Sequence, residues 1–189
     1  MHGTEIVKTA TFDEWSAFFD ANRDIQAIDA FVIDANGLVA GKRLEVEDAR
    51  GLYTRGVQFS KSALIADVHG HGHDAGGYGQ SDGDPDGSAM PLPGMLTRVP
   101  WAAKPTAQVL CQMTLADEGG AVWFDPRVIL GDVVAQCRRA GIHPVVACEL
   151  EFYLIDPRRG NDGSIRPATR PGGDPPRRPG NLSLETVDE

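Results

Sequence analysis

The sequence has little positive charge and no long apolar run, and both absences exclude classes of protein. Lys and Arg number 18 and Asp and Glu number 27, so the net charge at pH 7 is −9. Nucleic acid is therefore not an expected partner, because binding it requires a basic surface that releases counterions from the phosphates. No apolar run approaches the ~20 residues that a membrane-spanning helix needs, and residues 1–13 contain no apolar signal segment. A membrane is not an expected partner either.

Cysteine is also scarce. Cys111, Cys137 and Cys148 are widely separated and odd in number, and each lies in an apolar stretch. This pattern favours buried, reduced thiols, as in a cytoplasmic protein, over a disulfide framework. In other respects the composition is ordinary: 41% of the 189 residues are hydrophobic and 24% are charged, which is typical of one or two small globular domains.

Residues 1–118 predict an N-terminal helix followed by a small α+β domain. The helix is expected at 11–22, where Thr11 can cap it, Glu14 lies three positions later and the apolar residues follow helical spacing. Two apolar runs flank Asn36-Gly37, a pair that tolerates the positive φ of a tight turn, so a hairpin is expected around it. We assign residues 1–23 to the helix and residues 24–118 to a domain of the β-grasp type.

Further elements are expected inside this domain. A Gly- and Asp-rich loop should run from His69 to about Gly94. The remaining expectations are a short helix at 45–55 and strands at 61–68 and 106–115.

Residues 119–156 predict the start of a second domain. A helix is expected from Asp125, as cap, through Pro126, as first helical residue, to a stop at Gly141. An apolar strand is expected to follow it, up to Asp156. Residues 157–189 are rich in Pro, Gly and Arg and predict a loop or a flexible tail.

The segment ACELEFYLID, residues 147–156, places two carboxylates in this apolar strand. Side chains alternate between the faces of a strand, so Glu149 and Glu151 would lie together on the face opposite the apolar residues. Two neighbouring anions repel each other unless a cation lies beside them. Mg²⁺ and Mn²⁺ prefer oxygen ligands and would suit this face. In isolation, however, a solvated acidic face is the commoner interpretation of such a pair.

Several stretches, taken in order, resemble the N-terminal part of the glutamine synthetase superfamily. The run GYGQSDGDPD at 77–86 and the glutamate-bearing strand are most similar to the branch that glutamylates amines, the γ-glutamylpolyamine synthetases. The resemblance covers about residues 27–156. The four matching stretches are DANGLVAGKRL (34–44), GVQFSKSALIADVHG (56–70), MPLPGMLTRVPW (90–101) and HPVVACELEFYLID (143–156).

The resemblance implies an ATP-dependent reaction. Such enzymes phosphorylate the γ-carboxylate of glutamate, and an amine or ammonia then attacks the acyl phosphate, with Mg²⁺ or Mn²⁺ offsetting the phosphate charge. Glu149 and Glu151 match the family's two metal-ligand glutamates of this strand. The family's amine-site aspartate matches Asp86, with Asp82 and Asp84 as rivals because the loop allows a shift of register. An Asx turn is the structural alternative for Asp86.

Three histidines, His69, His71 and His73, would share one face of an extended segment and could bind a transition metal. No Cys or carboxylate partner is fixed by the sequence, so a solvated segment is the favoured interpretation.

Members of this family are more than twice as long, and their remaining metal ligands and ATP-binding elements have no counterpart among these 189 residues. We therefore expect either the N-terminal portion of a ligase that forms homo-oligomeric rings, or a truncated, non-catalytic module that binds a full-length ring. The chain alone is expected to be inactive.

Overall fold

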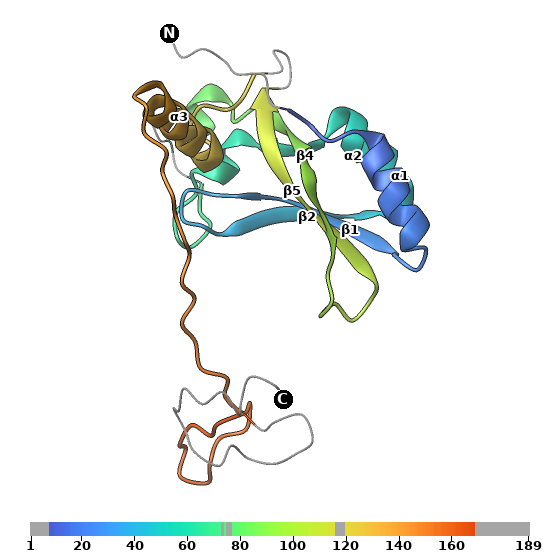
Figure 1. The fold of residues 1–189 in the computed structure, drawn as a ribbon, viewed down its shortest axis with the longest axis vertical. Coiled ribbons are helices and arrows are strands. Elements are labelled where there is room, and N and C mark those ends of the chain that lie inside the picture. The colour runs from blue at the N-terminus through green and yellow to red at the C-terminus, as the bar shows by residue number, and fades with distance from the viewer. Residues whose placement is uncertain (1–7, 73, 75–76, 116–119, 169–189) are drawn as a thin grey trace. The chain divides into compact units, whose positions relative to one another are not determined.

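A five-stranded mixed sheet organises the first part of the chain (Figure 1). The structure is a computed structural model that describes residues 8–72, 74, 77–115 and 120–168. The sheet order is β2-β1-β5-β4-β3, with β1 and β5 parallel and every other neighbouring pair antiparallel. The strands are β1 (Ala27–Ile33), β2 (Val39–Glu45), β3 (Val57–Ser60), β4 (Asp86–Arg98) and β5 (Thr106–Leu115).

The hairpin predicted around Asn36-Gly37 is confirmed as β1 and β2. Gly37 adopts a φ of +78°, which a residue without a Cβ reaches at little cost. Asp34 fixes the turn, because its carboxylate accepts hydrogen bonds from the backbone N–H groups of Asn36 at 2.9 Å and Leu38 at 2.7 Å. The turn is therefore stabilised by a side chain as well as by backbone geometry.

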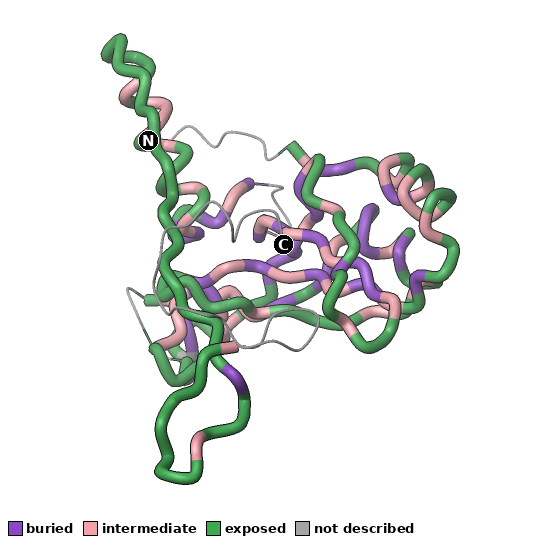
Figure 2. The backbone as a smooth tube through the Cα atoms, turned by 60° about the horizontal axis from the view of Figure 1, so that its bottom comes forward, coloured by how far each residue is buried: buried purple, intermediate pink, exposed green. Residues whose placement is uncertain are grey.

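One face of the sheet forms the core. Burial alternates along β1, as expected for a strand with one covered face, and Ile28, Val109 and Met113 are fully buried. The helices α1 (Phe12–Ala21) and α2 (Ala49–Arg55) contribute Trp15 and Leu52 to the same cluster. Each fully buried side chain of this size stabilises the fold by about 1.5–3 kcal/mol. Figure 2 shows the buried positions gathered on these strands and helices.

One lysine side chain of the edge strand β2 reaches the other edge strand, β3. Lys42 of β2 donates a hydrogen bond from its ammonium to the carbonyl of Gln58 of β3 at 2.7 Å, and the same ammonium lies 5.1 Å from the ring centroid of Phe59. This contact covers part of the exposed edge of β3, which would otherwise be free to pair with another chain.

Helix α1 confirms the prediction at 11–22, but its start differs in detail. Thr11 makes no side-chain capping hydrogen bond. The Glu14 carboxylate instead accepts from the backbone N–H of Gly94 at 3.1 Å. Gly94 lies where the register between β4 and β5 shifts, between Pro91 and Leu96, so its N–H is not used by the ladder. Glu14 therefore bonds to the bulge of β4 and not to the start of its own helix, so the predicted capping box is not formed.

Two predictions between β2 and β5 are wrong, and strand pairing explains both. The predicted strand at 61–68 is absent: β3 ends at Ser60, and Lys61–Leu64 is a 3-10 helix. Ser60 pairs with Asp86, the first residue of β4, so the following residues have no partner. The predicted loop also ends earlier, because β4 begins at Asp86 and tolerates its two prolines beside the bulge.

The helix predicted after Asp125 is confirmed as α3 (Pro126–Arg139). The Asp125 carboxylate accepts a hydrogen bond from the backbone N–H of Arg127 at 2.8 Å, and Gly141 ends the segment at a φ of +74°. The apolar residues Ile129, Leu130 and Val133 are exposed, so this helix buries none of its side chains completely.

Residues Met1–Pro144 and Val145–Glu189 form separate units. The predicted strand at 143–156 is not formed: residues 142–154 have no regular secondary structure, and within the described residues Ile155 makes one isolated bridge, to Pro167. A strand needs a neighbour for its backbone groups, and the described residues supply none here. Residues 169–189 of the predicted tail lie outside the described residues, and the predicted domain boundaries stay a prediction.

Candidate functional site

Asp86 is the first residue of β4 and is solvent-exposed. Pairing with Ser60 of β3 fixes its backbone, so its side chain projects from a sheet position. Among the residues that the structure describes, nothing donates a hydrogen bond to its carboxylate or forms an ion pair with it. The carboxylate is therefore available to an external cation.

The two rival aspartates are differently placed, because both carboxylates shape the loop. Asp82 accepts from the backbone N–H groups of Gly79 at 3.1 Å and Asp84 at 3.0 Å. Asp84 has a φ of +43°, and its carboxylate accepts from the N–H of Ser62 at 3.2 Å and from its hydroxyl at 2.7 Å. Aspartates commonly hold turns in this way. The Asx-turn role therefore falls on Asp82, whose carboxylate accepts from the N–H two residues on, whereas the Asp84 carboxylate links the loop to Ser62.

An aromatic group that sequence reasoning missed lies beside this loop. The indole N–H of Trp123 donates to the hydroxyl of Tyr78 at 2.9 Å. The ring centroids of Tyr78 and Phe124 are 4.7 Å apart, and the Lys61 ammonium lies 5.8 Å from the Tyr78 ring. The available signals were a lone tyrosine in a Gly-rich loop and a Trp-Phe pair next to the α3 cap, but neither specified that they would meet.

Glu149 and Glu151 are exposed residues of the second unit, whereas Asp86 belongs to the first. Within the described residues neither carboxylate accepts a hydrogen bond or forms an ion pair. Their oxygens suit Mg²⁺ or Mn²⁺, but two carboxylates supply only part of a coordination shell. In the described ranges, no group of three His, Cys, Asp or Glu side chains is arranged to hold a metal ion.

The histidine metal site, which the sequence left as the less favoured interpretation, receives no support from the described positions. His71 Nδ1 lies 3.4 Å from Oδ2 of Asp67, and Oδ1 of the same carboxylate accepts from the backbone N–H groups of His69 and His71. These contacts resemble a local turn more than an open ligand set. His73 lies outside the described residues.

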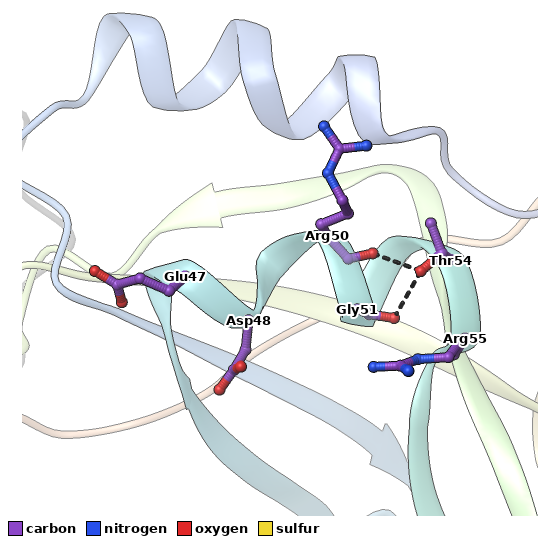
Figure 3. A pocket seen from close by; sticks show the side chains of 6 residues that line it. All are labelled: Glu47, Asp48, Arg50, Gly51, Thr54 and Arg55. Atoms are coloured by element: carbon purple, nitrogen blue, oxygen red, sulfur yellow. Dashed lines mark hydrogen bonds between the residues drawn. The ribbon is translucent and has the colours of Figure 1, made fainter.

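A hollow of about 370 Å³ lies beside α2, and no predicted site residue is among those that line it (Figure 3). Its lining mixes both charges, and Arg50 is turned toward α1, where its guanidinium lies 4.2 Å from the ring centroid of Phe12. The hollow is lined by Glu47, Asp48, Arg50, Gly51, Thr54 and Arg55.

Comparison with known proteins finds one family model and several relatives that this chain resembles. Residues 124–189 match the family model described as the glutamine synthetase catalytic domain. The gamma-glutamylputrescine synthetase PuuA of Escherichia coli (strain K12) is 35% identical over 167 residues, which are 88% of this chain and 35% of that protein. Glutamine synthetases of Mycobacterium bovis and Mycobacterium tuberculosis are 25% identical over 147 residues, 76% of this chain and 30% of theirs.

Solved structures agree at the level of the fold. The structure described as a GmaS/ADP complex has a TM-score of 0.50 at 20% identity and covers 73% of this chain and 26% of that chain. The Plasmodium falciparum glutamine synthetase has a TM-score of 0.51 at 13% identity, over 74% of this chain and 24% of that one.

The fold is thus of the mixed α/β class with one sheet, followed by residues that match the glutamine synthetase catalytic-domain model. The similarity to the glutamine synthetase superfamily that the sequence predicted is thus confirmed, and it extends over most of this chain. It spans about a third of the length of these curated relatives, 35% of the putrescine enzyme and 30% of the glutamine synthetases. Among the described helices, none has the length and apolar character to cross a membrane.

Proposed function

We propose that this chain is the N-terminal portion of an ATP-dependent ligase that joins the γ-carboxylate of glutamate to an amine through a γ-glutamyl phosphate. The observation that carries the proposal is the 35% identity with a gamma-glutamylputrescine synthetase, which extends over 88% of this chain. A short aliphatic diamine is accordingly the favoured acceptor, with ammonia as the alternative. The enzyme that contains this sequence is called the proposed ligase below.

Glu149 and Glu151 would hold the divalent cations, one carboxylate for each. Bound Mg²⁺ or Mn²⁺ would offset the charge of ATP and of the transferred phosphoryl group. The role of this chain is to present two carboxylates without competing hydrogen bonds at alternate positions of one segment. Pairing of that segment with the rest of a catalytic sheet would place both on one face.

Asp86 would act on the acceptor amine. Its unpaired carboxylate attracts the alkylammonium and can accept one of its protons, which leaves the neutral amine to attack the acyl phosphate. A new C–N bond would then form as phosphate leaves, and the nitrogen would lose its second proton to the leaving phosphate. The occupied carboxylates of Asp82 and Asp84 support the choice of Asp86 over them.

The first unit would serve as a β-grasp domain in a ring of identical subunits. The sheet order, with parallel β1 and β5 side by side near its centre, supports this assignment. In such a ring Asp86 would complete the active site of the neighbouring subunit, so Asp86 and Glu151 of one chain would serve different sites.

The test is ligation assayed in the proposed ligase with ATP, glutamate and, in turn, putrescine, methylamine and ammonia. We expect glutamate-dependent ADP release that rises with putrescine. Glu149→Gln and Glu151→Gln should abolish it, and Asp86→Asn should raise the KM for the amine, while the exposed control Asp48→Asn should behave as wild type. Lack of glutamate-dependent ATP cleavage with all three acceptors would overturn the proposal.

A further inference from the structure

Three aromatic rings join the Asp-rich loop to the residues that precede α3. We call Tyr78, Trp123 and Phe124 the aromatic latch. The ring centroids are 6.0 Å apart for Tyr78 and Trp123, 4.7 Å for Tyr78 and Phe124, and 5.4 Å for Trp123 and Phe124. Tyr78 therefore contacts both rings of the Trp-Phe pair, although it lies far from them in the sequence.

Burial alone does not account for Trp123. Phe124 and its neighbour Val122 are buried, as core residues are, but Trp123 remains 58% exposed. An indole at this exposure contributes little hydrophobic stabilisation for its size. Its specific contact is the hydrogen bond from Nε1–H to the Tyr78 hydroxyl at 2.9 Å. The geometry thus points to holding Tyr78 in place as the role of Trp123.

A chain of hydrogen bonds continues from Tyr78 toward Asp86. The next residue, Gly79, donates its N–H to Asp82 at 3.1 Å and accepts at its carbonyl from the N–H of Asp84 at 2.8 Å. The Asp84 carboxylate accepts a hydrogen bond from the Ser62 hydroxyl. The residue before Ser62, Lys61, donates its backbone N–H to the carbonyl of Pro85 at 3.4 Å. The loop is therefore fixed at one end by the aromatic latch and at the other by β3 and β4.

The other side of the aromatic latch lies at the start of the catalytic domain, because the family match begins at residue 124. We propose that Trp123 is a positioning residue: through Tyr78 it holds the loop that precedes Asp86 against the first residues of the catalytic domain. This inference rests on the proposed function for the role of Asp86, and on the contacts above for the restraint of the loop.

The restraint is tested by amide hydrogen exchange on the 189-residue chain. Trp123→Phe removes the donor but keeps a ring, and Tyr78→Phe removes the acceptor. In each variant the amides of Gly79 and Asp84 should exchange about fivefold faster, as expected for the loss of one exposed hydrogen bond. The double variant should exchange no faster than either single variant, because both remove the same bond.

The matched control is Trp101→Phe. Trp101 is 78% exposed and makes no ring contact or hydrogen bond with the described residues, so its replacement should leave the exchange of Gly79 and Asp84 unchanged. Unchanged exchange in both Trp123→Phe and Tyr78→Phe, or effects that add in the double variant, would overturn the restraint.

The catalytic consequence is measured in the proposed ligase. Trp123→Phe should raise the KM for putrescine about threefold to tenfold while the KM for glutamate and for ATP stays unchanged, since only the amine contacts Asp86. A residue that merely stabilises the fold would leave all three constants alone. An unchanged KM for putrescine in an active enzyme would overturn the positioning role. Wild-type enzyme without activity would instead count against the proposed function, and the exchange result would still decide whether the loop is restrained.

Discussion

Two apolar segments of similar composition differ in structure: one is a buried strand, and the other is exposed and has no regular secondary structure. In β5, which pairs with β1 and β4 on its two sides, Val109 and Met113 are fully buried in the core cluster. In residues 145–156, Leu150 is 85% exposed and Phe152 is 74% exposed, and no strand of the described residues pairs with them. The difference teaches that an apolar pattern specifies a strand only where neighbouring strands satisfy its backbone groups.

The largest effect on the free energy of unfolding should come from truncating a buried side chain of β5. Met113→Ala removes a fully buried side chain, so the free energy of unfolding should fall by about 2–5 kcal/mol. Leu150→Ala should change it by less than about 0.5 kcal/mol, because the side chain is exposed. Urea unfolding of the 189-residue chain followed by circular dichroism measures both. Equal losses would show that residues 145–156 pack into a core of their own.

A smaller effect should separate the two aspartates at the end of the loop. Asp84→Ala removes the hydrogen bonds from Ser62 and places alanine at a positive φ, so the free energy of unfolding should fall by about 1–3 kcal/mol. Asp84→Asn should recover part of this loss, since asparagine tolerates that backbone conformation. Asp86→Ala should leave stability nearly unchanged. The same unfolding assay applies, and a destabilising Asp86→Ala would assign Asp86 a structural role.

Substitution of Asp125 tests how much the N-terminal cap of α3 contributes to the free energy of unfolding. Asp125→Ala should lower the free energy of unfolding by about 0.5–2 kcal/mol, and Asp125→Asn, which keeps a capping oxygen, should cost little. Burial raises the pKa of Asp125 above its ordinary value of 3.8, against the opposing effect of the backbone N–H of Arg127.

The sign of the pH effect at Asp125 follows from that shift. The folded state binds the proton of Asp125 more tightly than the unfolded state does. Protonation of Asp125 therefore stabilises the fold at pH values below 3.8, and this contribution is lost as the pH rises through the raised pKa of the folded state. The stability of wild type relative to Asp125→Asn should therefore fall with rising pH across this window. A difference that rises instead would mean that the carboxylate is favoured in its charged form.

The smallest effect is expected at Tyr53. Its hydroxyl is buried without a hydrogen-bond partner among the described residues, and burial raises its pKa. Tyr53→Phe removes this unpaired group and should leave the free energy of unfolding unchanged or raise it by up to about 1 kcal/mol. Thermal unfolding is a suitable measurement. A clear loss of stability would reveal a partner for the hydroxyl, such as a buried water.

Local signals predicted the elements that depend on local contacts. Asn36-Gly37 specified the first hairpin, and Asp125 with Pro126 specified the start of α3. The errors arose where pairing with distant residues decides the outcome. Strand β3 ends at Ser60 because its partner strand begins at Asp86. The Glu14 carboxylate accepts a hydrogen bond from Gly94 at the bulge of β4 and does not form the predicted capping box.

The candidate site divides in the same way. A resemblance to a family could propose roles for Asp86, Glu149 and Glu151, because it compares residues one by one. It could not show that Asp82 and Asp84 are occupied by loop hydrogen bonds, nor that Trp123 contacts Tyr78, since both facts depend on the folded loop.

Binding of Mn²⁺ to the proposed ligase, followed by electron paramagnetic resonance, tests the central claim most directly. If Glu149 and Glu151 are metal ligands, Glu149→Gln and Glu151→Gln should each weaken Mn²⁺ binding on the order of 100-fold with no loss of folding stability, because both carboxylates are exposed in this chain. The exposed control Glu45→Gln should bind as wild type. Wild-type affinity in both glutamate variants would contradict the account and leave the pair as a solvated acidic face.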